Sequence, residues 1–406
     1  MMPAEPMTTP RELGGRIALI RGAAGRAFAP RLAASALART CELWRDREFS
    51  ARGATVARIA GDWGFSAALL HESLDALLAP FTAAALEAFA QQAARRRETI
   101  GFIMAGNVAG AGLHEIATAL IAGAGVVIKT ASTEPHFFAA FARTLSEVAP
   151  DLGARIAVFN WNRADAELAT ALRSRSDLLV AYGDDETVAR LGTGGQFIGF
   201  GSKLSGALVA PSALGAGRID RVVAALARDI ALFEQLGCLS PHHVFVLGGD
   251  ARGFAARLAD ALAESAAAMP PPARLKLGDG AAIRRAREVA RWRRIAGEPV
   301  ELWEGAHLSW TVIFDSCAAF CASPGFRTVY VSSIGGLEEL RARLAPARGA
   351  LEAFAIAGGE AEACAARRIL SAAGVSWICA PGEIQSPPLE WRHGGGAFLD
   401  LLVMHR

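Results

Sequence analysis

Apolar residues recur at every third or fourth position through much of the first hundred residues, a spacing that predicts α-helices. The pattern is clearest over residues 30–45, 55–59 and 65–97, where alanine, leucine and arginine dominate. From residue 100 onward, short apolar runs alternate with amphipathic stretches instead. This alternation is typical of βα units, so we predict a doubly wound α/β fold that follows a helical N-terminal region.

The first predicted βα unit brings two polar residues to the ends of strands. It begins with the apolar stretch TIGFIM, breaks into the glycine-rich turn AGNVAGAG, continues through the predicted helix GLHEIATALIAGAG and returns as the strand VVIK. Asn107 follows the first strand and Lys129 ends the second. Because open parallel sheets bind ligands beyond the carboxyl ends of their strands, both residues are candidates for a ligand site. The glycine spacing does not match the G-x-G-x-x-G fingerprint of dinucleotide-binding turns.

Cys238 stands in the connection between a predicted helix and a predicted strand. The helix is RIDRVVAALARDIALF, and the strand is HHVFVLG. Gly237, just before the cysteine, allows the backbone to turn sharply and leaves the sulfur open to a ligand. Both a buried structural cysteine and a reactive thiolate fit this position, since reactivity depends on exposure and on nearby charges.

Composition narrows the classes of protein to consider. A chain of 406 residues is long enough for two lobes with a cleft between them, and its net charge of +2 gives no general affinity for nucleic acid. The six cysteines are scattered without a C-x-x-C pair, so neither a disulfide framework nor a metal site is expected. The N-terminus lacks a signal-peptide pattern, and polar residues interrupt the most apolar stretch, 101–130. We therefore expect a cytoplasmic protein without a membrane span.

Three segments in this order resemble the aldehyde dehydrogenase superfamily, and in particular the acyl-CoA reductases of the LuxC type, the fatty-acid reductases of bacterial luminescence. AGNVAG resembles the segment whose asparagine amide forms half of the oxyanion hole, which implies that role for Asn107. ALIAGAGVVIKTAS resembles the segment whose lysine binds the adenosine ribose, which implies that role for Lys129. FEQLGCLSPHHVFV resembles the segment with the nucleophilic cysteine, which implies Cys238 as the nucleophile.

The resemblance implies an aldehyde-dehydrogenase-like fold with two Rossmann-like parallel-sheet lobes. In this arrangement residues 1–99 are a helical region that packs on the cofactor lobe, and residues 100–205 are the NAD(P)-binding lobe. Residues 206–380 are the catalytic lobe with the nucleophile, and residues 381–406 are a tail that returns to the cofactor lobe. Because members of this superfamily commonly assemble as homo-oligomers, the resemblance also implies self-association.

The segments that the resemblance assigns to the cofactor depart from the usual pattern of relatives. Where many NAD-specific relatives have a carboxylate soon after the lysine, this chain has Thr130 and Ser132. A carboxylate repels a 2′-phosphate and these residues do not, which favours NADPH; NADH is the alternative, because Glu134 is nearby. Gly183 stands at the start of the helix near the pyrophosphate and is followed by acidic residues. Glu304, in ELWEGAHLSW, corresponds to the glutamate that contacts the nicotinamide ribose.

The segment GFGSK is a further departure, because hydrolytic aldehyde dehydrogenases have a glutamate where this chain has Gly199. Without that general base, an acyl group on Cys238 persists to be reduced or exchanged with another thiol. The resemblance thus implies NADPH-dependent reduction of an acyl thioester, donated by CoA, a carrier protein or an acyl-transferring partner, to an aldehyde. Two alternatives stay open: a cysteine acyltransferase or thioesterase that needs no nicotinamide, and a non-catalytic scaffold subunit of an acyl-processing complex.

Four further polar residues near these segments have competing explanations. His242 and His243 suggest a Cys-His dyad with Cys238, but alternate residues on a strand face opposite sides, so at least one of them packs or caps. His114 and Glu115 open the predicted helix after Asn107 and lie near the predicted site, and a polar helix start explains them equally well. We therefore assign none of the four to the site.

Overall fold

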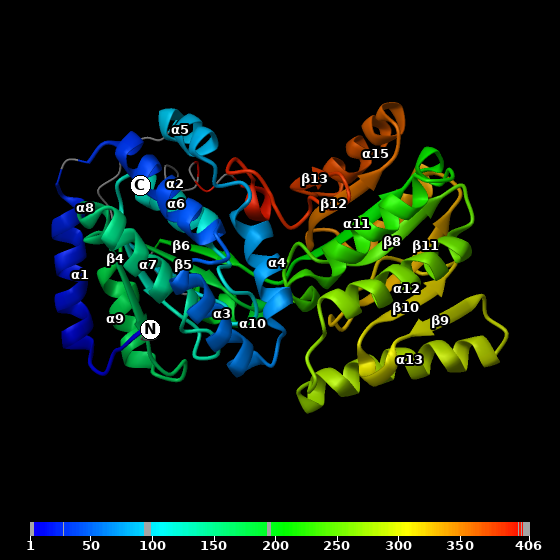
Figure 1. The fold of residues 1–406 in the computed structure, drawn as a ribbon, viewed down its shortest axis with the longest axis horizontal. Helices are drawn as coiled ribbons and strands as arrows, with labels where there is room; N and C mark the ends of the chain where they lie inside the picture. The colour runs from blue at the N-terminus through cyan, green and yellow to red at the C-terminus, as the bar shows by residue number, and fades with distance from the viewer. Residues whose placement is uncertain are drawn as a thin grey trace.

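The computed structural model describes residues 4–26, 28–92, 99–192, 196–396, 398 and 400. These residues form two lobes that lie side by side, each built on one sheet (Figure 1). The chain passes from the last strand of the first sheet to the first strand of the second through residues 201–203. Both sheets are parallel apart from one edge strand, and helices cover both faces of each, which confirms the predicted doubly wound α/β fold.

The first sheet has the strand order β1-β4-β3-β2-β5-β6, and all its described pairings are parallel. Its central strands are buried on both faces, which explains why their sequences are almost continuously apolar. The apolar pattern does not predict β1, because two residues are too few to show a period. The strand bounds are β1 Glu5–Pro6, β2 Thr99–Ile103, β3 Gly125–Lys129, β4 Ile156–Asn160, β5 Leu178–Tyr182 and β6 Phe197–Phe200.

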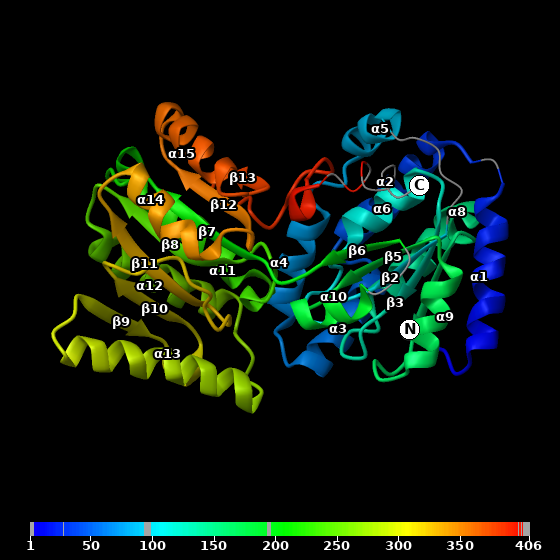
Figure 2. The same cartoon turned by 180° about the vertical axis from the view of Figure 1, so that it is seen from behind.

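Helices cover both faces of the first sheet, and more of them pack on one face than on the other. α1 and α9 lie side by side on one face (Figure 2). α6 and α7 cover the other face, and α2, α3, α4 and α5 extend the same apolar core outward. The helix bounds are α1 Pro10–Ala24, α2 Pro30–Arg45, α3 Ser50–Trp63, α4 Ala67–Leu78, α5 Ala83–Gln92, α6 Leu113–Ile121, α7 Phe137–Val148, α8 Pro150–Gly153, α9 Ala166–Arg175 and α10 Asp185–Leu191.

The second sheet has the strand order β13-β12-β7-β8-β11-β10-β9, in which only β9 is antiparallel to its neighbour among the described pairings. α11 and α12 cover one face, α14 and α15 cover the other, and α13 packs against β9 and β10. The strands are β7 Leu204–Val209, β8 Pro241–Leu247, β9 Val300–Glu304, β10 Thr311–Asp315, β11 Thr328–Ile334, β12 Leu351–Ala357 and β13 Trp377–Cys379. The helices are α11 Ile219–Ala231, α12 Ala251–Ala268, α13 Leu277–Ile295, α14 Leu337–Leu344 and α15 Glu360–Ala372.

The helix predicted over residues 65–97 is divided in the structure. α4 and α5 are separated by residues 79–82, which include Pro80, and residues 93–98 lie outside the described part. Proline lacks the N–H that a helix interior requires, so the division follows from the sequence. Within the described ranges no single helix is long and apolar enough to cross a membrane, and only the bent pair of α4 and α5 together meets that length and composition.

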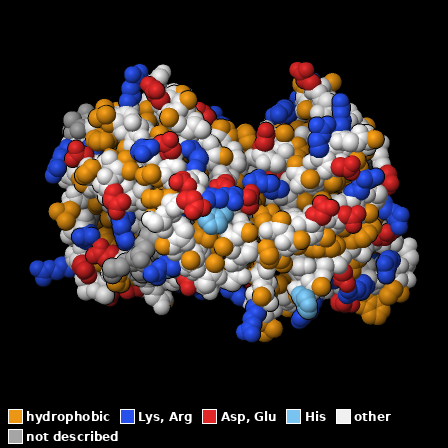
Figure 3. Space-filling view, viewed as in Figure 1, with side chains coloured by type: hydrophobic (Ala, Val, Ile, Leu, Met, Phe, Trp, Pro, Cys, Tyr) orange, Lys and Arg blue, Asp and Glu red, His pale blue; other side chains and the backbone are white. Residues whose placement is uncertain are grey.

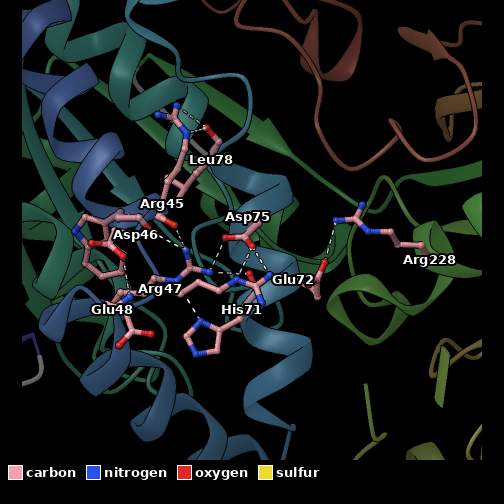
Figure 4. A network of polar contacts seen from close by, with 11 residues as sticks. Arg45, Asp46, Arg47, Glu48, His71, Glu72, Asp75, Leu78 and Arg228 are labelled. Atoms are coloured by element: carbon pink, nitrogen blue, oxygen red, sulfur yellow. Dashed lines mark hydrogen bonds and ion pairs between the residues drawn. The ribbon is translucent and has the colours of Figure 1, made fainter. Parts of the chain in front are cut away.

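Helix α4 of the first lobe makes direct contacts with the second lobe. Glu72 on α4 pairs with Arg228 on α11, with 3.3 Å between Oε2 and Nη2 (Figure 4). The backbone N–H of Phe233, five residues before Cys238, donates a hydrogen bond to the Ser73 hydroxyl at 3.1 Å. The segment that leads to the cysteine is therefore attached directly to a helix of the first lobe.

A network of charged groups holds α4 from its other side (Figure 4). Arg47 pairs with both Glu72 and Asp75 at 2.6 and 2.5 Å. The fully buried Arg52 lies 2.6 Å from the other oxygen of Asp75 and donates to the backbone carbonyls of His71 on α4 and Trp44 on α2. Because a buried guanidinium is costly without partners, these contacts fix α4 in one position.

Candidate active site

A cleft of about 980 Å³ lies between the lobes. The outline of the molecule is notched between the two lobes (Figure 3). One wall is formed by residues that follow β2, β3 and β5, and the opposite wall by the turn around Cys238 and by residues 322–325. Part of the C-terminal tail also lines it. Among the residues that the resemblance assigned to the site, those that line this cleft are Asn107, Lys129, Ser132, Gly183 and Cys238. His114, Glu115 and His242, which the sequence analysis left unassigned, line it as well.

The turn that leads to Cys238 has an unusual backbone. α11 ends at Ala231, and the next residues Phe233, Glu234 and Gln235 have φ angles of 55°, 52° and 59°. Residues other than glycine rarely adopt this left-handed backbone region, and each residue held there costs of order 1–3 kcal/mol of stability. Gly237, which the sequence suggested as the turning point, is not among the residues with positive φ.

Buried polar contacts to β11 and the segment before it stabilise this turn. Arg327 pairs with Glu234 at 2.5 Å, and both side chains are buried. The Gln235 amide donates to the carbonyls of Pro241 and Thr328 at 2.6 and 2.8 Å, and accepts from the Thr328 N–H at 2.7 Å. Paired contacts of this kind offset the cost of the strained backbone and give the segment before the cysteine one conformation.

Cys238 is half-buried, and its sulfur contacts a histidine from the far end of the chain. The distance from Cys238 Sγ to His393 Nε2 is 4.0 Å. The other ring nitrogen, Nδ1, lies 2.8 Å from Oε1 of Glu115 on α6. The three side chains thus form a nucleophile, base and carboxylate arranged in one line of contacts.

The charge state of His393 follows from its burial and its partners. Burial lowers the pKa of the imidazole, but the charge of Glu115 and the hydrogen bonds to Cys238 and Glu115 outweigh burial and raise the pKa to about 10. Burial likewise raises the pKa of the Glu115 carboxyl, and the charge and hydrogen bond of His393 outweigh it, so the pKa is lowered overall. At neutral pH these residues form a buried imidazolium and carboxylate pair.

The tail is anchored on both sides of His393. The backbone N–H of Gly394 donates to the carboxylate of Glu352 on β12 at 3.1 Å, and the Trp391 indole donates to the Ser376 hydroxyl at 3.2 Å. Gly394 has a φ of 65°, which a glycine adopts without strain, so the chain can reverse beside the cleft. These contacts, which join the tail to the second lobe, hold the imidazole ring at the cleft.

Two more titratable side chains lie next to this pair. Burial lowers the pKa of His114, whose Nε2 lies 2.9 Å from the Pro387 carbonyl. Burial, and after it the charge of Glu115, raises the pKa of the Tyr182 phenol well above its ordinary value. Both groups are therefore neutral at pH 7 and leave Glu115 and His393 as the charged pair.

Asn107 is oriented toward the cysteine turn. Its side-chain amide donates a hydrogen bond to the carbonyl of Leu236 at 2.6 Å. An amide nitrogen carries two N–H groups, so one remains for a ligand oxygen in the cleft. This position beside Cys238 is compatible with the oxyanion-hole role that the family resemblance implied.

A group of cations lies at the part of the cleft bounded by β3. Burial, and then the charge of Arg163, lowers the pKa of Lys129 to about 8, and the Lys129 Nζ lies 5.9 Å from the centre of the Trp161 ring. Arg163, Trp161 and Ser132 line the same region, and the sequence did not single out the first two. Cationic and hydroxyl side chains at this edge suit the ribose and phosphate of a nucleotide.

Two residues that the resemblance assigned to the cofactor lie away from the cleft. Thr130 is fully buried behind β3, where its hydroxyl donates to the Phe159 carbonyl and accepts from the Asn160 amide. Glu304 ends the edge strand β9 and forms ion pairs with Arg287 and Arg291 of α13. Thr130 follows the last residue of its strand with its side chain turned into the core, and Glu304 belongs to an edge strand on the far side of the second sheet.

Other acidic residues near the nucleotide edge have structural roles. The Glu134 carboxylate accepts the backbone N–H groups of His136 and Phe137 at the start of α7 and does not line the cleft. Asp184 is the N-cap of α10 and accepts from the Thr187 N–H at 2.7 Å. Neither carboxylate therefore needs a ligand to satisfy it.

The two histidines that follow Cys238 in sequence have partners of their own. His242 Nδ1 lies 2.9 Å from the Ser323 hydroxyl, and His243 Nε2 lies 2.8 Å from the Ser332 hydroxyl in the core. In the described part of the chain, no cluster of three or more histidine, cysteine, aspartate or glutamate side chains is arranged to bind a metal ion.

Comparison with known proteins matches this chain to one family of enzymes. The family model described as "Acyl-CoA reductase (LuxC)" matches residues 34–405. A curated relative, the "Long-chain acyl-protein thioester reductase" of Photorhabdus laumondii subsp. laumondii, is 26% identical over 247 residues, which cover 59% of this chain and 49% of the relative. This chain thus spans about half the length of the curated relatives that it matches.

Solved structures of similar fold belong to dehydrogenases and related enzymes. An oxidoreductase from Marinobacter aquaeolei has a TM-score of 0.76 at 13% identity, with 98% of this chain and 90% of that chain covered. An NAD-dependent benzaldehyde dehydrogenase from Corynebacterium glutamicum has a TM-score of 0.72 at 14% identity, with 92% and 86% covered. At these identities the similarity establishes the fold, and it confirms the expected aldehyde-dehydrogenase-like arrangement.

Proposed function

The chain belongs to the acyl-CoA reductase (LuxC) family, and on that premise we propose that it reduces an acyl thioester to an aldehyde through a covalent thioester on Cys238. One observation carries the proposal: Cys238, Asn107 and Lys129 come from distant parts of the chain and line the same cleft between two parallel sheets. A nucleophile, an oxyanion donor and a nucleotide-binding cation are what such a reaction requires in one place.

The residues of this chain have separate tasks in the proposed reaction. The Cys238 thiolate attacks the carbonyl carbon of the bound thioester. The free N–H of Asn107 stabilises the negative charge that develops on the carbonyl oxygen, where a single donor is typically worth about 3 kcal/mol of barrier. A bound nicotinamide cofactor supplies the hydride. When the carbon–sulfur bond to Cys238 breaks, the aldehyde leaves.

The side chains at the first-lobe edge fit a nicotinamide dinucleotide. In the proposal Lys129 and Ser132 contact the adenosine ribose, Arg163 contacts a phosphate, and Gly183 lies near the pyrophosphate. The cofactor is NADPH rather than NADH, because Lys129 and Arg163 attract a 2′-phosphate and Glu134, turned into the start of α7, does not oppose it.

Reduction is favoured over hydrolysis of the acyl-enzyme by two features. Residues 199–203 bring no carboxylate to the cleft, and a Cβ at Gly199 would lie 2.3 Å from the Val188 side chain, so this position has no room for glutamate. The pKa of His393, the other candidate base, is raised to about 10, so its neutral form is scarce at neutral pH, and water is a far weaker acid than a thiol and a poor proton donor to it. The acyl group on Cys238 therefore persists until it is reduced or passed to a thiol.

The activity is tested by incubating the purified chain with NADPH and acyl-CoAs of different chain lengths, and by trapping the aldehyde as a hydrazone. Aldehyde formation is expected with the unaltered chain and with Cys317→Ala, a cysteine exposed outside the cleft. Cys238→Ala is expected to abolish it. Thioester cleavage without NADPH consumption would instead favour the thioesterase alternative, and the same panel offered on an acyl carrier protein identifies the donor.

A further inference from the structure

The contact between Cys238 and His393 is not used by a reaction that requires only a thiolate, an oxyanion donor and a hydride. His393 belongs to the tail, 155 residues from Cys238 in the sequence. Its imidazole is held edgewise to the sulfur by Phe200 and Trp391, whose rings stack on its two faces at 4.0 and 4.2 Å. The two stacked rings confine the imidazole so that its Nε2 points at the Cys238 sulfur, where a thiol leaves or arrives in the proposed reaction.

The leaving group of the proposed reaction needs a proton. Reduction of a thioester by a reduced nicotinamide consumes one proton for each thiol that is released, since the thiol leaves as a thiolate. The groups that face His393 are the acid Glu115, the neutral His114 and Tyr182, the carboxylate Glu352 of the adjacent strand, and Cys238 itself. Among these described side chains, the imidazolium is the only cation that can donate a proton next to the sulfur.

We infer that His393, positioned by Glu115, transfers a proton between Cys238 and the sulfur of a departing or incoming thiol, and that the chain therefore exchanges acyl groups between thiols without nicotinamide. On acylation, the Cys238 sulfur bonds to the carbonyl carbon, the bond from that carbon to the thiol breaks, and the departing sulfur takes the Nε2 proton. In the reverse direction neutral His393 takes the proton of an incoming thiol, whose sulfur displaces Cys238 as a thiolate.

Glu115 acts through His393 and is a positioning residue. Its carboxylate accepts the Nδ1 proton, which leaves Nε2 facing the sulfur, and its charge favours the imidazolium. Replacement by glutamine keeps a hydrogen-bond acceptor near Nδ1 and removes the charge. In Glu115→Gln the acyl exchange is therefore expected to decline at a lower pH than in the unaltered chain, a change that a purely structural role does not produce.

The inference rests on the proposed acyl-thioester chemistry at Cys238 and is tested by isotope exchange. The full chain is mixed with an unlabelled acyl-CoA and labelled free CoA, without nicotinamide, and incorporation of label into acyl-CoA is followed from pH 6 to 10.5. The expected result is exchange that requires Cys238 and falls roughly a hundredfold or more in His393→Gln, the usual size of a general acid–base contribution.

A matched control is available in the first lobe. His136 also pairs with a carboxylate, Asp62, at 2.7 Å, but it does not line the cleft. His136→Gln is expected to exchange label at the rate of the unaltered chain. Circular dichroism and NADPH binding by the same preparations show whether each variant is folded.

The outcomes separate the two proposals. If the chain reduces acyl-CoA but exchanges no label without nicotinamide, or if folded His393→Gln exchanges as fast as the unaltered chain, the inference is wrong and the reductase proposal stands. If mass spectrometry finds no acyl group on Cys238 with any thioester and no aldehyde forms, both proposals fail. Exchange that needs Cys238, His393 and the charge of Glu115 supports the inference.

Discussion

Phe200 lies face to face with His393, with ring centroids 4.0 Å apart and planes 9° apart. Trp391 covers the opposite face of the imidazole. Phe200 directly follows Gly199, which the family resemblance places where hydrolytic aldehyde dehydrogenases have a glutamate. In this chain the same segment holds a histidine of the tail.

Replacing Phe200 tests whether this stacking matters for the reaction. In Phe200→Ala the imidazole loses the support of one face, so we expect kcat for thioester reduction to fall about tenfold or more, as small errors of orientation typically cause. The KM for NADPH should change little. Phe200→Tyr keeps the ring and should retain most of the activity; an alanine variant with unchanged kcat would show that the stacking has no role.

Asn107→Ala removes the proposed oxyanion donor. We expect kcat to decrease by a factor of about 10² to 10³, the usual effect of losing one such donor. Because Cys238 and His393 are untouched, alkylation of Cys238 by iodoacetamide should proceed at nearly the original rate. Parallel losses of alkylation and reduction would mean instead that Asn107, through its bond to Leu236, mainly holds the cysteine turn.

Local sequence patterns are enough to predict much of the fold and part of the candidate site. Short apolar runs separated by amphipathic stretches suffice to predict parallel strands buried on both faces, and the cleft lies at the carboxyl ends of those strands. Asn107, Lys129 and Cys238 each follow or end such an element, so the sequence could single them out. The break at Pro80 depends on one residue type, yet the helical spacing alone predicted an unbroken helix over residues 65–97.

Contacts between distant segments could not be predicted in the same way. His393 stands in a glycine-rich tail without any period, and only the folded chain brings it beside Cys238 and Glu115. Glu304 is a second example, since a short similarity in sequence suggested a cofactor contact, whereas in the structure its side chain forms ion pairs with Arg287 and Arg291 of α13 and does not line the cleft. Spacing along the chain contains no information about either arrangement.

Cofactor choice can be tested at Ser132. A carboxylate introduced by Ser132→Asp would face the cations Lys129 and Arg163 and repel a 2′-phosphate. We expect the KM for NADPH to rise at least tenfold while the KM for NADH stays the same or falls. Steady-state kinetics with both cofactors measure the ratio, and an unaltered preference would show that Ser132 lies away from the ribose.

Stability should depend on pH through the pair of His393 and Glu115. The folded-state pKa of His393 is raised to about 10, above the value of roughly 6.5 for an unfolded histidine. The pair therefore stabilises the fold fully below about pH 6.5 and loses this contribution as the pH rises toward 10. Urea denaturation of the unaltered chain and of His393→Gln should give free energies of unfolding that converge over this range; a constant difference would contradict the assignment.

The strongest effect on stability is expected at the turn before Cys238. Arg327→Met leaves the Glu234 carboxylate buried without its ion pair, which typically costs about 3–5 kcal/mol in the free energy of unfolding. The exposed pair of Arg341 and Glu338 offers a control, since Arg341→Met should cost no more than about 0.5 kcal/mol.

The pH dependence of the Arg327→Met deficit identifies its cause. Burial raises the pKa of Glu234 to about 7 even though the charge and hydrogen bond of Arg327 lower it, so without Arg327 the pKa must be higher still. A carboxyl whose folded-state pKa is raised loses stability as the pH rises through that value. The deficit should therefore be smaller at pH 5.5 than at pH 8.5. An equal deficit at both pH values would mean that lost packing, rather than an unpaired charge, destabilises the turn that positions Cys238.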